Sequence, residues 1–273
     1  MRSIVVPVNF TANSANAARY VGDLALAIGA DIHLIYVFQP PVSAAEVPLP
    51  ESVFEEMLEN GQELLSGIKT DLIAQTAGKI HVTTTLETGG VELKIETFCK
   101  EKKPLLVVMG ATGDSLENVL SGSNTARALR HLPYPILVVP EGSKFRAVER
   151  IVLACDKEDV DSGIPETIPL LRELSDLMGA RLEVVHVLTN SEEYAAEAIE
   201  EYNVWKKEAK AFEPEIHLIH RHSVEEGIRD FLEVNSADWL MVFPKSHSML
   251  ELHHSRSRQI LHHCTVPVIS VHE

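Results

Sequence analysis

The feature that most constrains this chain is an internal repeat, in which three segments occur twice in the same order. The matched pairs are 4–9 (IVVPVN) with 151–156 (IVLACD), 28–37 (IGADIHLIYV) with 178–187 (MGARLEVVHV), and 131–139 (HLPYPILVV) with 263–271 (HCTVPVISV). Such a repeat predicts two copies of one structural plan instead of one large domain. We therefore predict one domain over residues 1–141 and a second over 150–273, joined by a short polar linker.

In both halves, short β-branched runs alternate with longer periodic segments, which is the pattern of βα units around a parallel sheet. The predicted strands are 3–8, 31–38, 79–86, 104–109 and 135–139 in the first half, and 150–155, 181–188, 215–221, 238–243 and 267–271 in the second. The predicted helices are 13–28, 51–76, 90–100, 121–131, 162–178, 191–211, 223–234 and 255–263. The first helix is expected to begin at an Asn13 or Ser14 cap and to end at Gly29. The acidic stretches 51–63 and 192–201 are expected to be solvated helix faces.

Bulk properties exclude several classes of partner. The formal net charge of −16 argues against DNA or RNA as a general partner. The three cysteines form no CxxC pair, which is typical of reduced thiols in a cytoplasm. The chain begins with a strand-like run instead of a signal peptide, and no apolar stretch is long enough to span a membrane. We therefore expect a soluble, cytoplasmic protein.

A glycine-rich loop after the fourth predicted strand has the chemistry of a phosphate site. Gly110 and Gly113 follow the strand, and Gly122-Ser123 opens the next predicted helix. Glycines allow backbone N–H groups to approach an anion, and a helix N-terminus adds unpaired donors and a positive dipole end. In a doubly wound sheet this loop lies beside the end of the first strand, so Asn9 is a candidate for a ribose hydroxyl and Val37 for a base. The alternative is that the glycines only make a tight strand-to-helix turn.

The tandem layout, the opening VPVNFTANSANAARY, and G-x-x-G followed by G-S-N-T resemble the universal stress protein family, specifically its two-domain tandem type. The resemblance covers nearly the whole chain. It implies an α/β fold with a Rossmann-like, doubly wound, five-stranded parallel sheet in each half. It also implies that the halves pair through their last strands as an intramolecular pseudo-dimer, and that the protein acts in stress adaptation.

The resemblance further implies that the first half binds ATP or AMP, with or without Mg²⁺. The predicted nucleotide-binding residues are Pro7, Val8, Asn9, Val37, Met109, Gly110, Thr112, Gly113, Gly122, Ser123, Asn124 and Thr125. The sequence departs from the family pattern in two ways. The spacer Asp114–Ser121 has eight residues where the family has nine, and Asn9 stands where ATP-binding members usually carry an acid.

The second half lacks the glycine loop. Its corresponding segment, which begins at Pro244, contains no glycine, although Asp156 supplies an acid opposite Asn9. Side chains at these positions would hinder a close backbone approach to phosphate, so we expect no nucleotide there in the ATP mode. Ser255, Arg256 and Ser257 at a predicted helix start retain the chemistry for a lone anion.

Four functions remain open from the sequence. The leading expectation is a regulatory protein that binds an adenine nucleotide and signals to an unknown protein partner, with pairing of two copies left open. The first alternative is a nucleotide-independent scaffold, and the second is a slow ATPase, although no P-loop, nucleophile elbow or catalytic triad occurs. The third is a metal-binding protein, suggested by histidines gathered in the second half without a metal-ligand spacing: His220, His222, His247, His253, His254, His262 and His263.

Overall fold

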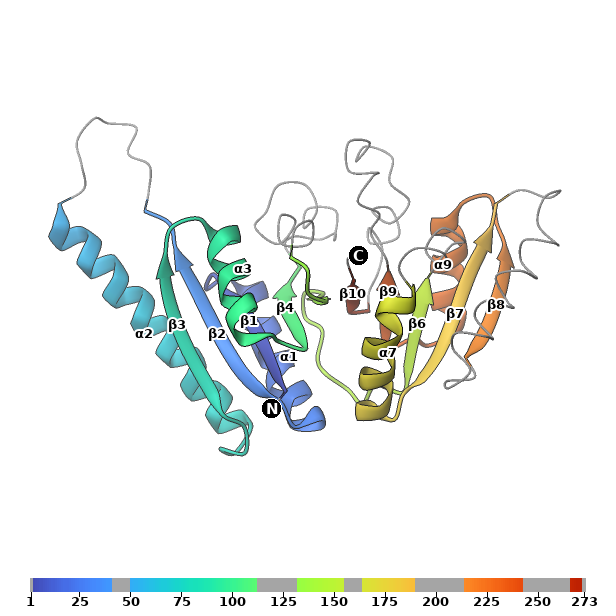
Figure 1. The fold of residues 1–273 in the computed structure, drawn as a ribbon, viewed down its shortest axis with the longest axis horizontal. Coiled ribbons are helices and arrows are strands. Elements are labelled where there is room, and N and C mark those ends of the chain that lie inside the picture. Colours follow the sequence, from blue (N-terminus) through green and yellow to red (C-terminus); the bar gives the residue numbers. More distant parts are fainter. Residues whose placement is uncertain are drawn as a thin grey trace.

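The fold is one continuous sheet with helices on both faces. The computed structural model describes residues 2–40, 50–111, 132–154, 164–189, 214–242 and 266–271. Within these ranges, ten strands form one sheet in the order β3-β2-β1-β4-β5-β10-β9-β6-β7-β8. Figure 1 shows the two halves side by side, with β10 at the centre between β4 and β9, and with α2 and β8 at opposite ends.

The first half supplies five parallel strands and three described helices. The strands are β1 (Ser3–Val8), β2 (Asp31–Phe38), β3 (Val82–Thr88), β4 (Leu106–Gly110) and β5 (Ile136–Val139). The helices are α1 (Ala12–Ile28), α2 (Glu51–Gln75) and α3 (Val91–Lys102). The chain order reverses at β1, which pairs with β2 on one side and with β4 on the other, both in parallel. This is the doubly wound arrangement, and its switch point lies between β1 and β4.

The second half repeats this plan. Its strands are β6 (Arg150–Ala154), β7 (Arg181–Leu188), β8 (Glu215–His220), β9 (Trp239–Val242) and β10 (Val268–Ser270), with described helices α7 (Ile164–Met178) and α9 (Val224–Val234). The strand β6 lies between β7 and β9, as β1 lies between β2 and β4. The predicted fold class, two doubly wound α/β units in tandem, is therefore confirmed.

The halves meet where β5 and β10 pair, which is an antiparallel contact in an otherwise parallel sheet. Leu137 faces Ile269, Val138 faces Val268, and Ile136 faces Ser270. Since 136–138 and 268–270 are equivalent in the repeat, this register places a local two-fold axis at the Leu137–Ile269 pair. An interface that uses the same patch from both sides is isologous.

Two apolar layers lie on opposite faces of the sheet. One packs β1 and β6 residues such as Val6 and Leu153 against α1 and α7, and the other packs Val5 and Val152 against α3 and α9. Adjacent residues of one strand thus enter different layers, which explains the continuous apolar runs in the sequence. None of the helices in the described ranges combines the length and the apolar character needed to cross a membrane.

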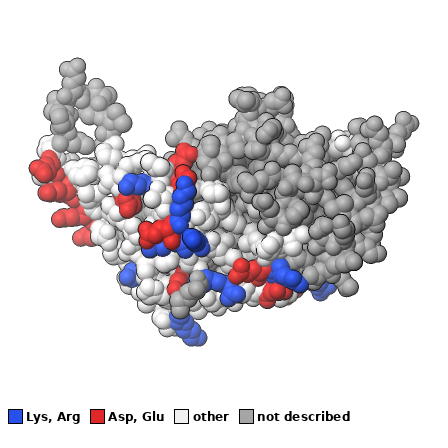
Figure 2. Space-filling model, viewed as in Figure 1, with Lys and Arg blue, Asp and Glu red and all other residues white. Residues whose placement is uncertain are grey.

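The helix α2 carries much of the acidic surface. Figure 2 shows acidic side chains along the edge of the molecule formed by this helix. Its N-terminal half exposes Glu51, Glu55, Glu56, Glu59 and Glu63, as predicted for the acidic stretch 51–63. The second acidic stretch, 192–201, lies outside the described residues.

Two local predictions were wrong. The N-cap of α1 is Thr11, not Asn13 or Ser14, because the Thr11 side chain accepts a hydrogen bond from the Ser14 amide. The third strand begins at Val82, not at residue 79, because Ala77 and Gly78 both adopt left-handed backbone angles, with φ values of 50° and 68°. The predicted end of α1 at Gly29 is confirmed, with φ of 64°.

Candidate functional site

A cavity lies at the switch point of the first half. It has a volume of about 70 Å³ and is lined by Pro7, Val8, Asn9, Thr11, Asn13, Ser14, Ile35, Val37, Val91, Ile95, Met109 and Gly110. These residues come from the carboxyl ends of β1, β2 and β4, and from the first turns of α1 and α3. Ligands of open α/β sheets bind at this edge. The volume is well below the roughly 300–1,000 Å³ of typical ligand pockets, so the described part of the cavity is too small by itself to enclose a nucleotide.

Six of the predicted site residues line this one cavity: Pro7, Val8, Asn9, Val37, Met109 and Gly110. They come from three segments that are far apart in the sequence, and the parallel register brings them together. The other six, Thr112, Gly113, Gly122, Ser123, Asn124 and Thr125, lie outside the described residues. Their part in the site stays a prediction.

A compact hydrogen-bond network shapes the turn between β1 and α1. The Oδ1 atom of Asn9 accepts from the Thr11 hydroxyl at 2.7 Å and from the Thr11 amide at 3.3 Å. The Ser14 hydroxyl accepts from the Asn9 amide at 3.4 Å and donates to the Thr11 carbonyl at 3.1 Å. Because both lone pairs of Oδ1 are used within the turn, the Asn9 side chain offers a ligand its NH₂ donor, not an acceptor.

The same turn contains a strained residue. Phe10 has φ of 61°, a left-handed conformation that non-glycine residues rarely adopt. Its ring packs against Tyr36 with the ring centres 4.5 Å apart. We attribute the strained backbone to this packing, which fixes the direction in which Asn9 and Thr11 leave the strand.

Gly110 has a packing role that the sequence did not reveal. A Cβ atom at this position would lie 2.3 Å from the Asn13 carbonyl oxygen in the first turn of α1. The end of β4 and the start of α1 therefore touch backbone to backbone. Glycine is required here whether or not a phosphate binds, so Gly110 alone is no evidence for a ligand.

Several cavity residues were not predicted from the sequence. Thr11, Asn13 and Ser14 belong to the α1 start, and Ile35, Val91 and Ile95 supply apolar surface from β2 and α3. The available signal was the i,i+4 spacing of Val91 and Ile95 directly after Gly89-Gly90, at the start of a helix that follows a strand. That spacing indicates a buried helix face but not the presence of a cavity.

The second half differs at the corresponding place. The helix starts Val91 and Val224 align, so Gly227 occupies the position of Lys94, and Val187 that of Val37. A Cβ atom on Gly227 would lie 2.5 Å from Cγ1 of Val187. Helix α9 therefore lies directly on β7 at the level where Val37 lines the cavity of the first half.

The strand registers correct one assumption about the repeat. Ile4 pairs with Leu106, and Ile151 pairs with Trp239, so Leu106 and Trp239 are equivalent. The residue equivalent to Gly110 is then Phe243, not Pro244 as the sequence comparison suggested. Phe243 itself lies outside the described residues.

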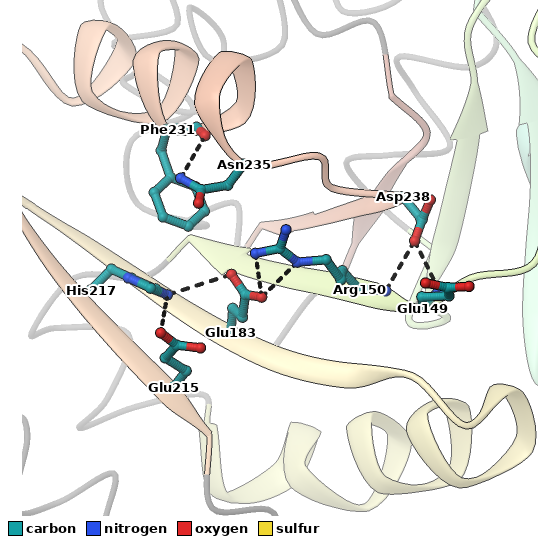
Figure 3. Close-up of polar contacts among 8 residues, drawn as sticks. All are labelled: Glu149, Arg150, Glu183, Glu215, His217, Phe231, Asn235 and Asp238. Carbon is teal, nitrogen blue, oxygen red and sulfur yellow. Dashed lines mark hydrogen bonds and ion pairs between the residues drawn. The ribbon is translucent and has the colours of Figure 1, made fainter.

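A buried charge cluster lies under α9 in the second half (Figure 3). Glu183 on β7 is 3% exposed, and its Oε1 accepts from Nε of Arg150 at 2.7 Å. The Nε2 atom of His217 on β8 lies 3.4 Å from Oε2 of Glu183 and 3.7 Å from Glu215. Neither Oε2 nor Nε2 makes a hydrogen bond in the described structure. The His217 ring packs on Phe231 of α9, with ring centres 4.8 Å apart.

This cluster does not have the form of a metal site. The guanidinium of Arg150 is already paired with the Glu183 carboxylate, and its positive charge would repel a metal cation. Among the described residues, no group of three or more His, Cys, Asp or Glu side chains is arranged to hold a metal ion. Of the histidines that suggested a metal, His220 and His222 are exposed, and His247, His253, His254, His262 and His263 lie outside the described residues.

The comparisons with known proteins agree with this architecture. Residues 1–140 match the model of the universal stress protein family, so the chain belongs to that family. A universal stress protein of Methanocaldococcus jannaschii is 34% identical over 146 residues, which are 52% of this chain and 84% of the relative.

Two solved structures share the fold over the whole length. A universal stress protein from Archaeoglobus fulgidus superposes with a TM-score of 0.73 at 17% identity, covering 99% of this chain and 96% of the other. A putative universal stress protein from Pseudomonas aeruginosa gives a TM-score of 0.62 at 15% identity, covering 99% and 93%. These matches support an arrangement of two similar units within one chain.

Proposed function

We propose that this protein is a cytoplasmic regulatory member of the universal stress protein family that binds ATP or AMP in its first half. The observation that carries the proposal is the convergence of Asn9, Val37 and Met109 on one cavity at the switch point. The apolar floor formed by Ile35, Val37 and Ile95 suits a base, and the Asn9 amide and Thr11 suit the polar groups of a ribose.

The phosphates would lie beyond the described part of the cavity. None of the described lining residues is charged at neutral pH, so these residues favour the nucleoside part of the ligand. We propose that the 110–125 segment supplies the phosphate contacts through its glycine N–H groups and the Gly122-Ser123 helix start. Asp114 and Glu117 in this segment disfavour a bare triphosphate, and a bound Mg²⁺ would offset their charge.

We propose a binding role in preference to a dedicated enzyme. The described lining residues include no histidine, carboxylate, lysine or cysteine that could serve as a general base. The second half, in which α9 lies on β7, would then complete a pseudo-dimer through the β5–β10 pairing and present surface to a protein partner. The domain limits 1–141 and 150–273 are part of this proposal.

The first test is the small molecule that travels with the purified protein. Acid release followed by HPLC should yield an adenine nucleotide at near-stoichiometric level. A protein that is empty after purification and binds neither AMP nor ATP in calorimetry would favour the nucleotide-independent scaffold. Mg²⁺-dependent release of phosphate from ATP would instead support the slow ATPase.

Substitution of the loop glycines tests where the nucleotide binds. Gly113→Val or Gly122→Val should abolish nucleotide binding in calorimetry and leave the circular dichroism spectrum unchanged, because the added side chain blocks the backbone approach to phosphate. The matched control is Gly67→Val on α2, where an added Cβ meets no atom within 4 Å. Unchanged affinity in both loop variants would contradict the assignment.

A further inference from the structure

Helix α1 carries, on one face, residues that reach both the candidate site and the second half. Asn13 lines the cavity in the first turn. Asn16 and Tyr20 follow three and seven residues later, a spacing that places all three on the same side of a helix. The distance from Asn13 to Tyr20 is about 10 Å along the helix axis. A rigid element of this length connects the two regions directly.

The far end of this face contacts the core of the second half. The indole Nε1 of Trp239 donates a hydrogen bond to the Tyr20 hydroxyl at 2.7 Å. Trp239 is fully buried at the start of β9, and Tyr20 is 4% exposed. Burial raises the pKa of the Tyr20 hydroxyl, so it remains protonated at all ordinary pH values. Loss of the acceptor would leave a buried N–H without a partner.

The middle of the face contacts the chain where it leaves β5 and enters the linker between the halves. The Nδ2 atom of Asn16 donates to the carbonyls of Pro140 and Ser143, both at 3.2 Å. The ring of Phe145, also in the linker, packs edge-on against Tyr20 with the ring centres 5.4 Å apart. A movement of α1 therefore changes the contacts of the linker and of Trp239 together.

We propose that α1 couples occupancy of the first-half site to the packing of the second half through Asn16 and Tyr20. A ligand that contacts Thr11, Asn13 and Ser14 fixes the first turn of α1, and the helix transmits that restraint to the Trp239 contact. Coupling between two sites is reciprocal, so the Tyr20–Trp239 bond must in turn contribute to ligand affinity. The inference rests on the nucleotide binding proposed above, and it names how that site is regulated.

The test is calorimetry with AMP and with ATP on wild-type protein and on Tyr20→Phe, which keeps the ring and removes the acceptor. The dissociation constant should rise by about fivefold or more in the variant. The control is Arg2→Gln, which removes another contact between the halves, the 2.8 Å ion pair with Glu173, without touching α1. This control should change the dissociation constant far less than Tyr20→Phe does.

A second readout uses Trp239 itself. In a Trp205→Phe background Trp239 is the only indole, and its emission should shift on saturation with AMP or ATP. If wild-type protein binds the nucleotide and Tyr20→Phe binds it with an equal dissociation constant, the coupling is overturned and the proposed function remains. The same holds if the protein binds the nucleotide but Trp239 emission does not change at saturation. Absence of any binding to the wild type overturns the proposed function and the coupling with it.

Discussion

At equivalent positions beneath α3 and α9, the two halves carry different polar groups, a half-buried histidine in the first and a buried glutamate in the second. In the first half, His33 on β2 forms a hydrogen bond with the Thr83 hydroxyl and meets Phe98 edge-on, with ring centres 6.3 Å apart. In the second half the equivalent of His33 is Glu183, whose carboxylate is held by Arg150. A neutral imidazole–hydroxyl pair loses little free energy when it is partly removed from water, whereas a buried carboxylate requires a partner.

The difference shows that a duplicated fold does not duplicate its sources of stability. In the second half a buried carboxylate is paired with Arg150, and α9 lies close to β7 at Gly227. At these positions the described residues of the first half form the His33–Thr83 hydrogen bond instead of a charge pair, and a cavity lies beside Val37. Under the proposed function, the first copy would bind the ligand, and the second would contribute packing to the shared sheet.

The largest expected effect comes from breaking the charge pair. Arg150→Met should lower the free energy of unfolding by about 3–5 kcal/mol, because it removes the charged donor to Oε1 of the buried Glu183 and leaves only the His217 ring, 3.4 Å from Oε2, beside the carboxylate. Urea unfolding measures this loss. The double variant Arg150→Met/Glu183→Leu should recover most of it, since no charge then remains buried. A loss below about 1 kcal/mol in the single variant would show that the pair stabilises the fold no more than a solvent-exposed ion pair does.

A smaller effect is expected at the contact between α9 and β7. Gly227→Ala should cost about 1–3 kcal/mol, because the new Cβ overlaps Val187. Adding Val187→Ala should relieve the overlap in the double variant. At the equivalent position in the first half, Lys94→Ala removes only the exposed ion pair with Glu87 and should cost less than about 1 kcal/mol. Equal losses at both positions would mean that the helices pack alike.

The smallest expected effect is a pH dependence of the free energy of unfolding, which arises from His33 in the first half. Burial and the nearby Lys102 lower the pKa of His33, His81 acts in the same direction, and Asp31 and Glu101 oppose it. The unfolded chain therefore takes up this proton more readily. The stability from the neutral ring is complete above the unfolded pKa of about 6.5 and is lost as the pH falls through that value towards the folded pKa.

The measurement is the urea midpoint at pH 7.5 and at pH 5.5 for wild type and His33→Gln. The wild-type midpoint should fall more between the two pH values, because glutamine does not titrate. Parallel pH profiles would assign the acid sensitivity to other groups and remove this contrast between the halves.

The sequence predicted the features that depend on local pattern. The bounds of β2 and β7 agree with the predicted 31–38 and 181–188. Each strand is an apolar run that begins two residues after a helix-ending glycine, Gly29 or Gly179, so its first residue was easy to predict. The predicted site residues Asn9, Val37 and Met109 do line one cavity, although their role in binding stays a prediction. Parallel βα units place the carboxyl ends of neighbouring strands at one edge, so topology alone was sufficient.

Features that depend on tertiary approach could not be predicted. The contact of Gly110 with Asn13 requires the distance between β4 and α1, which no periodicity encodes. The pair of Arg150 and Glu183 arises only when the register of β6 and β7 is known. In the same way, the hydrogen bond between Trp239 and Tyr20 forms only when the two halves are packed together.

The pairing of β5 with β10 also limits how this chain can meet other chains. Two separate five-stranded sheets would offer four unpaired strand edges, and among the described strands the joined sheet offers two, at β3 and β8. The edges removed are the short, buried and mainly apolar strands Ile136–Val139 and Val268–Ser270, which would otherwise be templates for pairing with another copy. Joining the halves in one chain thus gives each a permanent partner at a one-to-one ratio, and it removes that surface from competition with any other protein.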